Sequence, residues 1–152
     1  MTEDARFEDA GGAALRLAAE TAGDLQVIAS LCQDAVFPAT EMTFDAKERR
    51  FAILINRFRW EDGTARPERV QSVLAFDGVT GVRSNGIDRT DADQVLSLLT
   101  IEASETDDGS RLTLVLAGDG AVELRAEVLA ATLADVTRPY YAPSGHKPDH
   151  KL

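Results

Sequence analysis

The sequence is poor in cysteine, histidine and aromatic residues: it has one cysteine, two histidines and 6% aromatic residues in a chain of 152. The lone thiol of Cys32 cannot form a disulfide or a thiolate metal site within one chain. The longest uninterrupted apolar runs, such as 51–55, hold only a few residues, whereas a membrane-spanning helix needs ~20. These absences exclude disulfide-rich and helical membrane proteins and favour a soluble domain in a reducing cytoplasm.

Signatures of familiar catalytic sites are also missing. The sequence has no G-x-S-x-G elbow, P-loop, dinucleotide-binding glycine triplet, H-E-x-x-H or C-x-x-C motif. His146 and His150 are candidate metal ligands by residue type, but Pro148 between them prevents a regular helix from presenting both on one face. We therefore predict no cofactor. A carboxylate pair such as Glu102 and Glu123 on neighbouring strands is the remaining enzymatic option.

The charge is strongly negative, with 26 acidic and 16 basic residues giving a formal net charge of −10. Such a field repels nucleic acid and anionic lipid surfaces. Residues 47–89 are the exception, because they carry a net charge of +3 between two acidic segments. Thirteen of the 16 basic residues are arginine, which suits carboxylate and phosphate recognition. An anion-binding surface is therefore expected to come from the middle third.

Hydrophobic periodicity predicts one helix over residues 21–35, where Leu25, Ile28 and Cys32 recur at helical spacing and Pro38 sets the end. From Glu127 the helical period returns, and it predicts a second helix that Pro139 ends. Alternation of apolar and polar residues predicts strands between these helices and before the first. The predicted strands cover residues 14–19, 41–45, 50–60, 69–76, a segment around 82, 96–103, 111–117 and 121–126.

Tight turns join consecutive strands, which indicates antiparallel pairing and an α+β fold. We predict a bent, mainly antiparallel sheet of about seven strands with one helix in the N-terminal half and one C-terminal helix. This order resembles a pleckstrin-homology-like roll, and two helices on one face of a flat sheet are the competing architecture. Residues 1–12 are predicted as a flexible leader, 13–139 as one globular domain and 140–152 as a flexible tail. An unpaired sheet edge makes a homodimer plausible.

An aromatic and basic cluster at residues 56–60 is the main candidate for binding. Guanidinium groups beside aromatic rings can hold an anion or stack a base. The alternative is that the rings belong to the core while the arginines are solvated on the opposite face. The predicted patch consists of Arg50, Arg57, Arg59, Trp60 and Arg69.

Several segments resemble an uncharacterised bacterial family, a domain of unknown function that makes up nearly the whole of short single-domain proteins. The resemblance covers about residues 14–150 and rests on segments 25–28, 48–52, 56–60, 69–74 and 148–150. It implies a cytoplasmic bacterial protein and supplies no substrate, cofactor or catalytic residue.

The residues favour a non-enzymatic binding module whose arginine-rich patch meets an acidic partner or a small anion through charge-assisted pairs. One alternative is a small enzyme with a carboxylate-based or metal-dependent site. The other is a single-stranded nucleic-acid binder that uses Phe58, Arg59 and Trp60.

Overall fold

The computed structural model describes residues 14–58, 68–88, 90–136 and 140–141. Within these ranges it contains one α-helix, two short 3₁₀ helices and eleven strands. In chain order the elements are β1 (Arg16–Ala19), α2 (Ala22–Leu31), β2 (Val36–Pro38), η2 (Ala39–Glu41), β3 (Met42–Asp45), β4 (Arg50–Phe58), β5 (Glu68–Asp77), β6 (Val79–Asn85), β7 (Val95–Thr106), β8 (Gly109–Leu116), η4 (Ala117–Asp119), β9 (Ala121–Ala126), β10 (Ala131–Asp135) and β11 (Tyr140–Tyr141).

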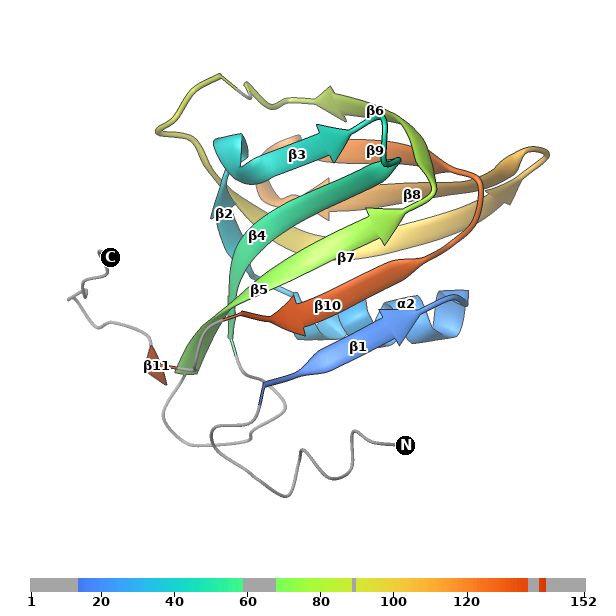
Figure 1. The fold of residues 1–152 in the computed structure, drawn as a ribbon. Coiled ribbons are helices and arrows are strands. Elements are labelled where there is room, and N and C mark those ends of the chain that lie inside the picture. The colour runs from blue at the N-terminus through green and yellow to red at the C-terminus, as the bar shows by residue number, and fades with distance from the viewer. Residues whose placement is uncertain (1–13, 59–67, 89, 137–139, 142–152) are drawn as a thin grey trace.

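All strand pairs are antiparallel, and their order is β1-β10-β5-β4-β2-β7-β8-β9-β6, with β3 on β4 and β11 on β5. The sheet is strongly bent, so that β4, β5 and β10 lie in front of β7, β8 and β9 (Figure 1). Gly78, with φ of +78°, lets the chain turn from β5, which pairs with β10, into β6, which pairs with β9. The predicted mainly antiparallel, bent sheet is confirmed.

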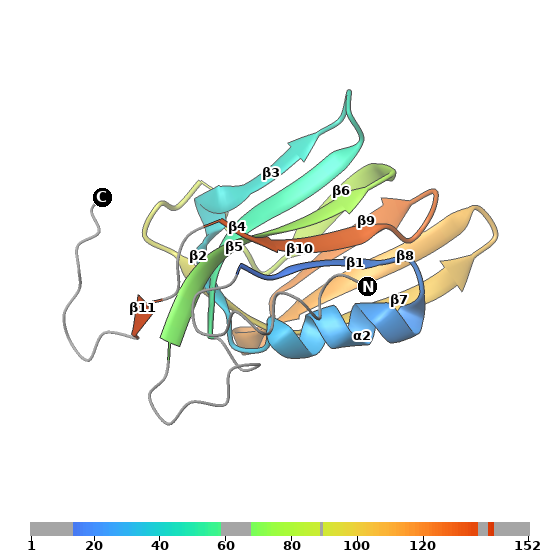
Figure 2. The same ribbon diagram turned by 60° about the horizontal axis from the view of Figure 1, so that its bottom comes forward.

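Helix α2 confirms the predicted N-terminal helix. The hydroxyl oxygen of Thr21 accepts a hydrogen bond from the backbone N–H of Asp24, and Leu25, Ile28 and Ala29 are buried. The helix lies along β1 and β7 (Figure 2). It ends at Leu31 rather than at the predicted residue 35, because Asp34 adopts a φ of +68° and donates its backbone N–H to the carbonyl oxygen of Leu98 on β7.

The predicted C-terminal helix is wrong. Residues 131–135 form strand β10, which lies between β1 and β5, and Ala131 and Leu133 face the core. Residues spaced three or four apart in 128–136 mimic a helical stripe, but tertiary pairing decides the outcome. The described residues thus lack the closing helix of a pleckstrin-homology-like roll, and the flat sheet with two helices is wrong as well.

The strand prediction is incomplete rather than misplaced. Eleven strands replace the predicted seven, chiefly because β2, β10 and β11 carry no clear alternation. The predicted leader and most of the predicted tail lie outside the described residues, although Tyr140–Tyr141 pair with β5. The core fills the space between the two layers, and strand β4 contributes Phe51, Ile53 and Ile55, as expected from its alternation.

Candidate anion-binding surface

Arg57 does not lie on the surface, contrary to the prediction. The side chain is 0% exposed and projects from the same face of β4 as Ile53 and Ile55. Strand alternation explains this placement, because odd-numbered residues of β4 all point inward. The prediction of a solvated Arg57 is therefore wrong, and its guanidinium does not belong to a surface patch.

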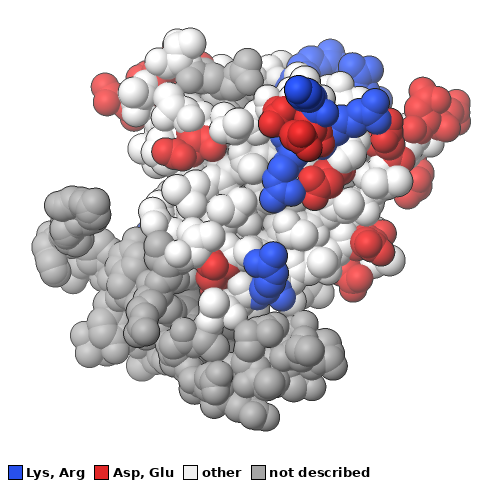
Figure 3. Space-filling view, in the orientation of Figure 1, with Lys and Arg blue, Asp and Glu red and all other residues white. Residues whose placement is uncertain are grey.

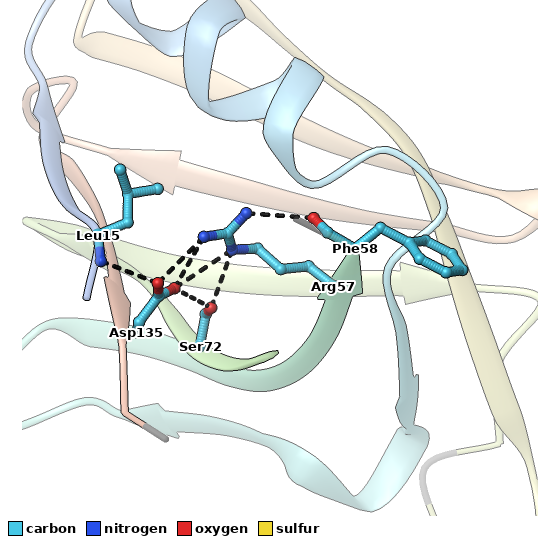
Figure 4. Close-up of polar contacts among 5 residues, drawn as sticks. All are labelled: Leu15, Arg57, Phe58, Ser72 and Asp135. Atoms are coloured by element: carbon cyan, nitrogen blue, oxygen red, sulfur yellow. Dashed lines mark hydrogen bonds and ion pairs between the residues drawn. The ribbon is translucent and has the colours of Figure 1, made fainter. Parts of the chain in front are cut away.

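Arg57 belongs instead to a buried polar cluster with Ser72 and Asp135 (Figure 4). Its Nη2 lies 2.9 Å from Asp135 Oδ1, and the Asp135 side chain is 1% exposed. Asp135 also accepts a 2.7 Å hydrogen bond from the Ser72 hydroxyl and a 2.8 Å hydrogen bond from the backbone N–H of Leu15. The carboxylate is thus fully engaged, and the cluster joins β4, β5, β10 and the segment before β1.

Arg50 and Arg69, the other described members of the predicted patch, lie at opposite ends of the β4–β5 pair. Arg50 lies at the opposite end of β4 from Arg57, and its Nη1 is 2.9 Å from Asp77 Oδ1 in an exposed ion pair. The Arg69 guanidinium lies over the Phe58 ring, 4.3 Å from its centroid. Arg59 and Trp60 lie outside the described residues.

Basic side chains lie close beside acidic ones on the face drawn in Figure 3. The ion pairs Arg50–Asp77 and Arg49–Glu127 balance much of the positive charge near the start of β4. The described arginines at the start of β4 are therefore already paired with carboxylates.

A different group of arginines converges on the outer face of β6, β8 and β9. Arg111 on β8 lies directly opposite Arg125 on β9, and Arg125 in turn lies opposite Gly81 on β6. At the next position on the same face of the sheet, two residues along each strand, Arg83 lies opposite Glu123. These side chains line a cavity of about 460 Å³, and we call them the arginine surface: Gly81, Val82, Arg83, Arg111, Glu123 and Arg125.

Positive charge exceeds negative charge on the arginine surface, with three guanidinium groups and one carboxylate lining the cavity. Glu123 lies 2.6 Å from Arg111 Nε and 3.8 Å from Arg83 Nη2. Within the described ranges, Arg125 has no ion-pair partner. Like charges directly opposite one another destabilise a sheet. A bound anion would relieve this repulsion.

Gly81 leaves room for the guanidinium of Arg125 above β6. A Cβ atom built at this position would lie 3.2 Å from Arg125 Nη2 and 3.6 Å from Nε. The register also shifts between Val79 and Gly81, which marks a bulge in β6. The Arg125 guanidinium therefore lies close to the backbone of β6 at Gly81.

Sequence reasoning missed the arginine surface, although part of it was predictable. Arg111 and Arg125 are equidistant from Gly118, so antiparallel pairing of their two predicted strands about that residue places them opposite each other. Arg83 comes from the predicted middle third, but its pairing with β9 depends on the bend at Gly78. No local sequence pattern predicts the direction in which the chain bends there.

The remaining candidates do not form a site. Glu102 and Glu123 are separated by the strand that carries Thr113, so they do not face each other as a carboxylate pair. The thiol of Cys32 is buried. Across the ranges that the structure covers, no three His, Cys, Asp or Glu side chains are arranged to hold a metal ion. His146 and His150 lie outside those ranges.

A family model matches residues 15–150 of the chain, which is most of its length. The chain belongs to DUF2948, a family of proteins of unknown function. The resemblance expected from the sequence is confirmed. Comparison with curated proteins and with solved structures found no match. Of the helices in the described part of this DUF2948 protein, none has the length and apolar character needed to cross a membrane.

Proposed function

We propose that this DUF2948 protein is a non-enzymatic binding module whose arginine surface binds a small oxyanion or an acidic group of a partner. The observation that carries the proposal is the direct cross-strand juxtaposition of Arg111 and Arg125 beside a cavity. Glu123 compensates Arg111, whereas the facing Arg125 guanidinium has no ion-pair partner in the described part of the chain, so an anion bound between the two arginines would pair with Arg125.

The geometry suits a carboxylate or phosphate group. Arginine presents a planar fork of donors that matches two oxygens at once, which lysine does not. The Glu123 carboxylate lies 2.6 Å from Arg111 Nε, whereas its distance to Arg83 Nη2 is 3.8 Å. Glu123 is therefore paired mainly with Arg111. Arg83 and Arg125 are therefore the groups most available to a ligand, while Glu123 orients Arg111.

Isothermal titration calorimetry with inorganic phosphate and with a glutamate-rich peptide tests the proposal. Arg125→Gln and Arg111→Gln should each weaken binding about tenfold, because each removes charge-assisted hydrogen bonds. Affinity should also fall as salt rises from 0.05 to 0.5 M (about a threefold shorter Debye length), since the arginine surface is exposed to solvent.

Arg16→Gln is the matched control, because Arg16 is an exposed arginine on β1, outside the arginine surface. The control should bind as the unmodified protein does. Equal losses in Arg16→Gln and Arg125→Gln would mean that binding follows overall charge and would contradict the proposal.

The alternative functions remain predictions. The nucleic-acid hypothesis depends on Arg59 and Trp60, and the metal-dependent enzyme depends on His146 and His150, which all lie outside the described residues. Cytoplasmic location and homodimer formation likewise stay predictions from the sequence.

A further inference from the structure

A second cavity, of about 530 Å³, lies at the end of the sheet where three connections meet. The turn from β1 to α2, the β7–β8 hairpin and the link from β9 to β10 all come together there, at the right-hand end of Figures 1 and 2. It shares no lining residue with the arginine surface. Any ligand of this cavity is therefore independent of the function proposed above.

Carboxylates provide most of the charge in this cavity. Glu20, Glu105 and Glu127 line it, one from each connection. Glu127 is paired with Arg49 at 2.6 Å, whereas Glu20 and Glu105 have no ion-pair partner in the described part of the chain. The three carboxylates are too dispersed to form a metal-binding group. Their arrangement suits a ligand with more than one positive centre.

A buried hydroxyl group provides independent evidence for a ligand. Ser110 lines the cavity and is only 6% exposed, because it lies on the inward face of β8 together with Leu112. Its hydroxyl makes no hydrogen bond to any residue that the structure describes. A buried polar group without a partner costs free energy. A bound molecule that forms a hydrogen bond with this hydroxyl would remove that cost.

One part of the wall is apolar. Val128 and Leu129 line the cavity together with two alanines, and Val128 is 55% exposed. Methylene groups pack favourably on such a wall, whereas a hydrated inorganic cation gains nothing from it. The net charge of −10 also draws cations toward the protein.

We propose that this cavity binds an aliphatic polyammonium group, with Glu20 and Glu105 pairing with separate ammonium centres, Ser110 accepting a hydrogen bond and Val128 covering the methylene chain. The ligand is either a free polyamine or neighbouring lysine side chains of a basic segment, since both present ammonium groups on alkyl stems.

Calorimetry and thermal unfolding on the full chain test this proposal with three probes: spermidine, an N-acetylated tetralysine amide, and MgCl₂ at matched ionic strength. We expect one-to-one binding of spermidine or the peptide, with a rise in unfolding temperature that MgCl₂ does not produce. Tighter binding of spermidine identifies a free polyamine as the ligand, and tighter binding of the peptide identifies a basic segment. Either result supports the proposal.

Glu105→Gln should weaken binding about tenfold, because it removes a charged acceptor from the cavity. Ser110→Ala should weaken it severalfold while leaving the ligand-free protein at least as stable, since the substitution removes an unsatisfied buried hydroxyl. Glu102→Gln is the matched control, because Glu102 is exposed on the outer face of β7 and does not line the cavity.

Equal stabilisation by MgCl₂ and spermidine would overturn the proposal, as would equal losses of affinity in Glu102→Gln and Glu105→Gln. Absence of binding by both ammonium probes would overturn it too. Each outcome leaves phosphate binding at the arginine surface to be judged separately, because Glu105→Gln and Ser110→Ala do not touch that surface.

Discussion

Arg57 on β4 and Asp135 on β10 form an ion pair across the intervening strand β5, with a 2.9 Å contact and side chains that are 0% and 1% exposed. Ser72 on β5 lies between them and hydrogen-bonds to both. Removing one member of such a pair leaves a buried charge without compensation, whereas the intact pair has its desolvation cost offset by several hydrogen bonds.

The first prediction concerns this pair. Asp135→Ala should lower the free energy of unfolding by about 3–5 kcal/mol, because it removes the carboxylate that compensates the charge of the buried Arg57 guanidinium. Replacing both partners, as in Arg57→Met with Asp135→Leu, should cost less than Asp135→Ala alone. Urea unfolding of the single and double variants measures the difference. The exposed pair is the control, since Arg50→Met should change stability by about 1 kcal/mol or less.

A second prediction uses Gly81 to test the arginine surface without altering its charge. Gly81→Ala would place a methyl group 3.2 Å from Arg125 Nη2 and displace that guanidinium from the cavity wall. We expect phosphate affinity to fall about threefold to tenfold while the unfolding midpoint changes little. Calorimetry together with thermal unfolding separates these effects. Unchanged affinity would show that the position of Arg125 is unimportant for binding.

Two glycines with positive φ should respond very differently to alanine. At Gly109, with φ of +145°, a Cβ would clash with the carbonyl oxygen of Ala126, so Gly109→Ala should cost about 3 kcal/mol or more. At Gly118, with φ of +80°, no atom lies within 4 Å, and only backbone strain of about 1–2 kcal/mol is expected. Chemical denaturation of both variants checks the order, and similar losses would contradict it.

The stability of the loop after β6 should depend on pH. The pKa of Asp88 is lowered below its ordinary value of 3.8, chiefly by the hydrogen bond from the Thr90 hydroxyl and then by that from the Thr90 backbone N–H. Because the folded pKa is depressed, this stabilisation is present above pH 3.8 and is lost as the pH falls through the lowered value.

Thr90→Ala should therefore raise the pKa of Asp88 toward its ordinary value. NMR titration of the side-chain carboxyl carbon measures this directly. Asp119, an exposed carboxylate in η4, serves as the internal control because it lies outside the loop. A pKa of Asp88 that does not move in Thr90→Ala would contradict the assigned cause.

Local patterns predicted the elements whose periodicity agrees with their environment. Helix α2 was predictable from Leu25, Ile28 and the Thr21 cap, and β4 from its alternating apolar residues. Strand β10 was not, because the spacing of Ala131 and Ala134 fits a helical stripe as well as a strand. Pairing with β1 and β5 resolves this ambiguity, and it is a property of the whole fold.

The same distinction applies to the candidate site. The alternation of β4 already places Arg57 in register with Ile53 and Ile55, but a charge among core residues contradicts the usual preference for exposure. The ion pair with Asp135, 78 residues away, compensates this buried charge. The arginine surface likewise depends on the bend at Gly78, which places Arg83 beside Glu123.

Among the described strands, β1 pairs with β10 alone, and the backbone N–H of Leu15 donates to an acceptor 120 positions further along the chain. During synthesis, β1 must therefore wait for β10 before it gains this neighbour. Such long sequence separation slows folding. The pairing of β1, β10 and β5 is therefore complete only after residue 135 has emerged, and a stalled translation product that stops before β10 exposes the edge of β5 that β10 normally covers to chaperones or to aggregation.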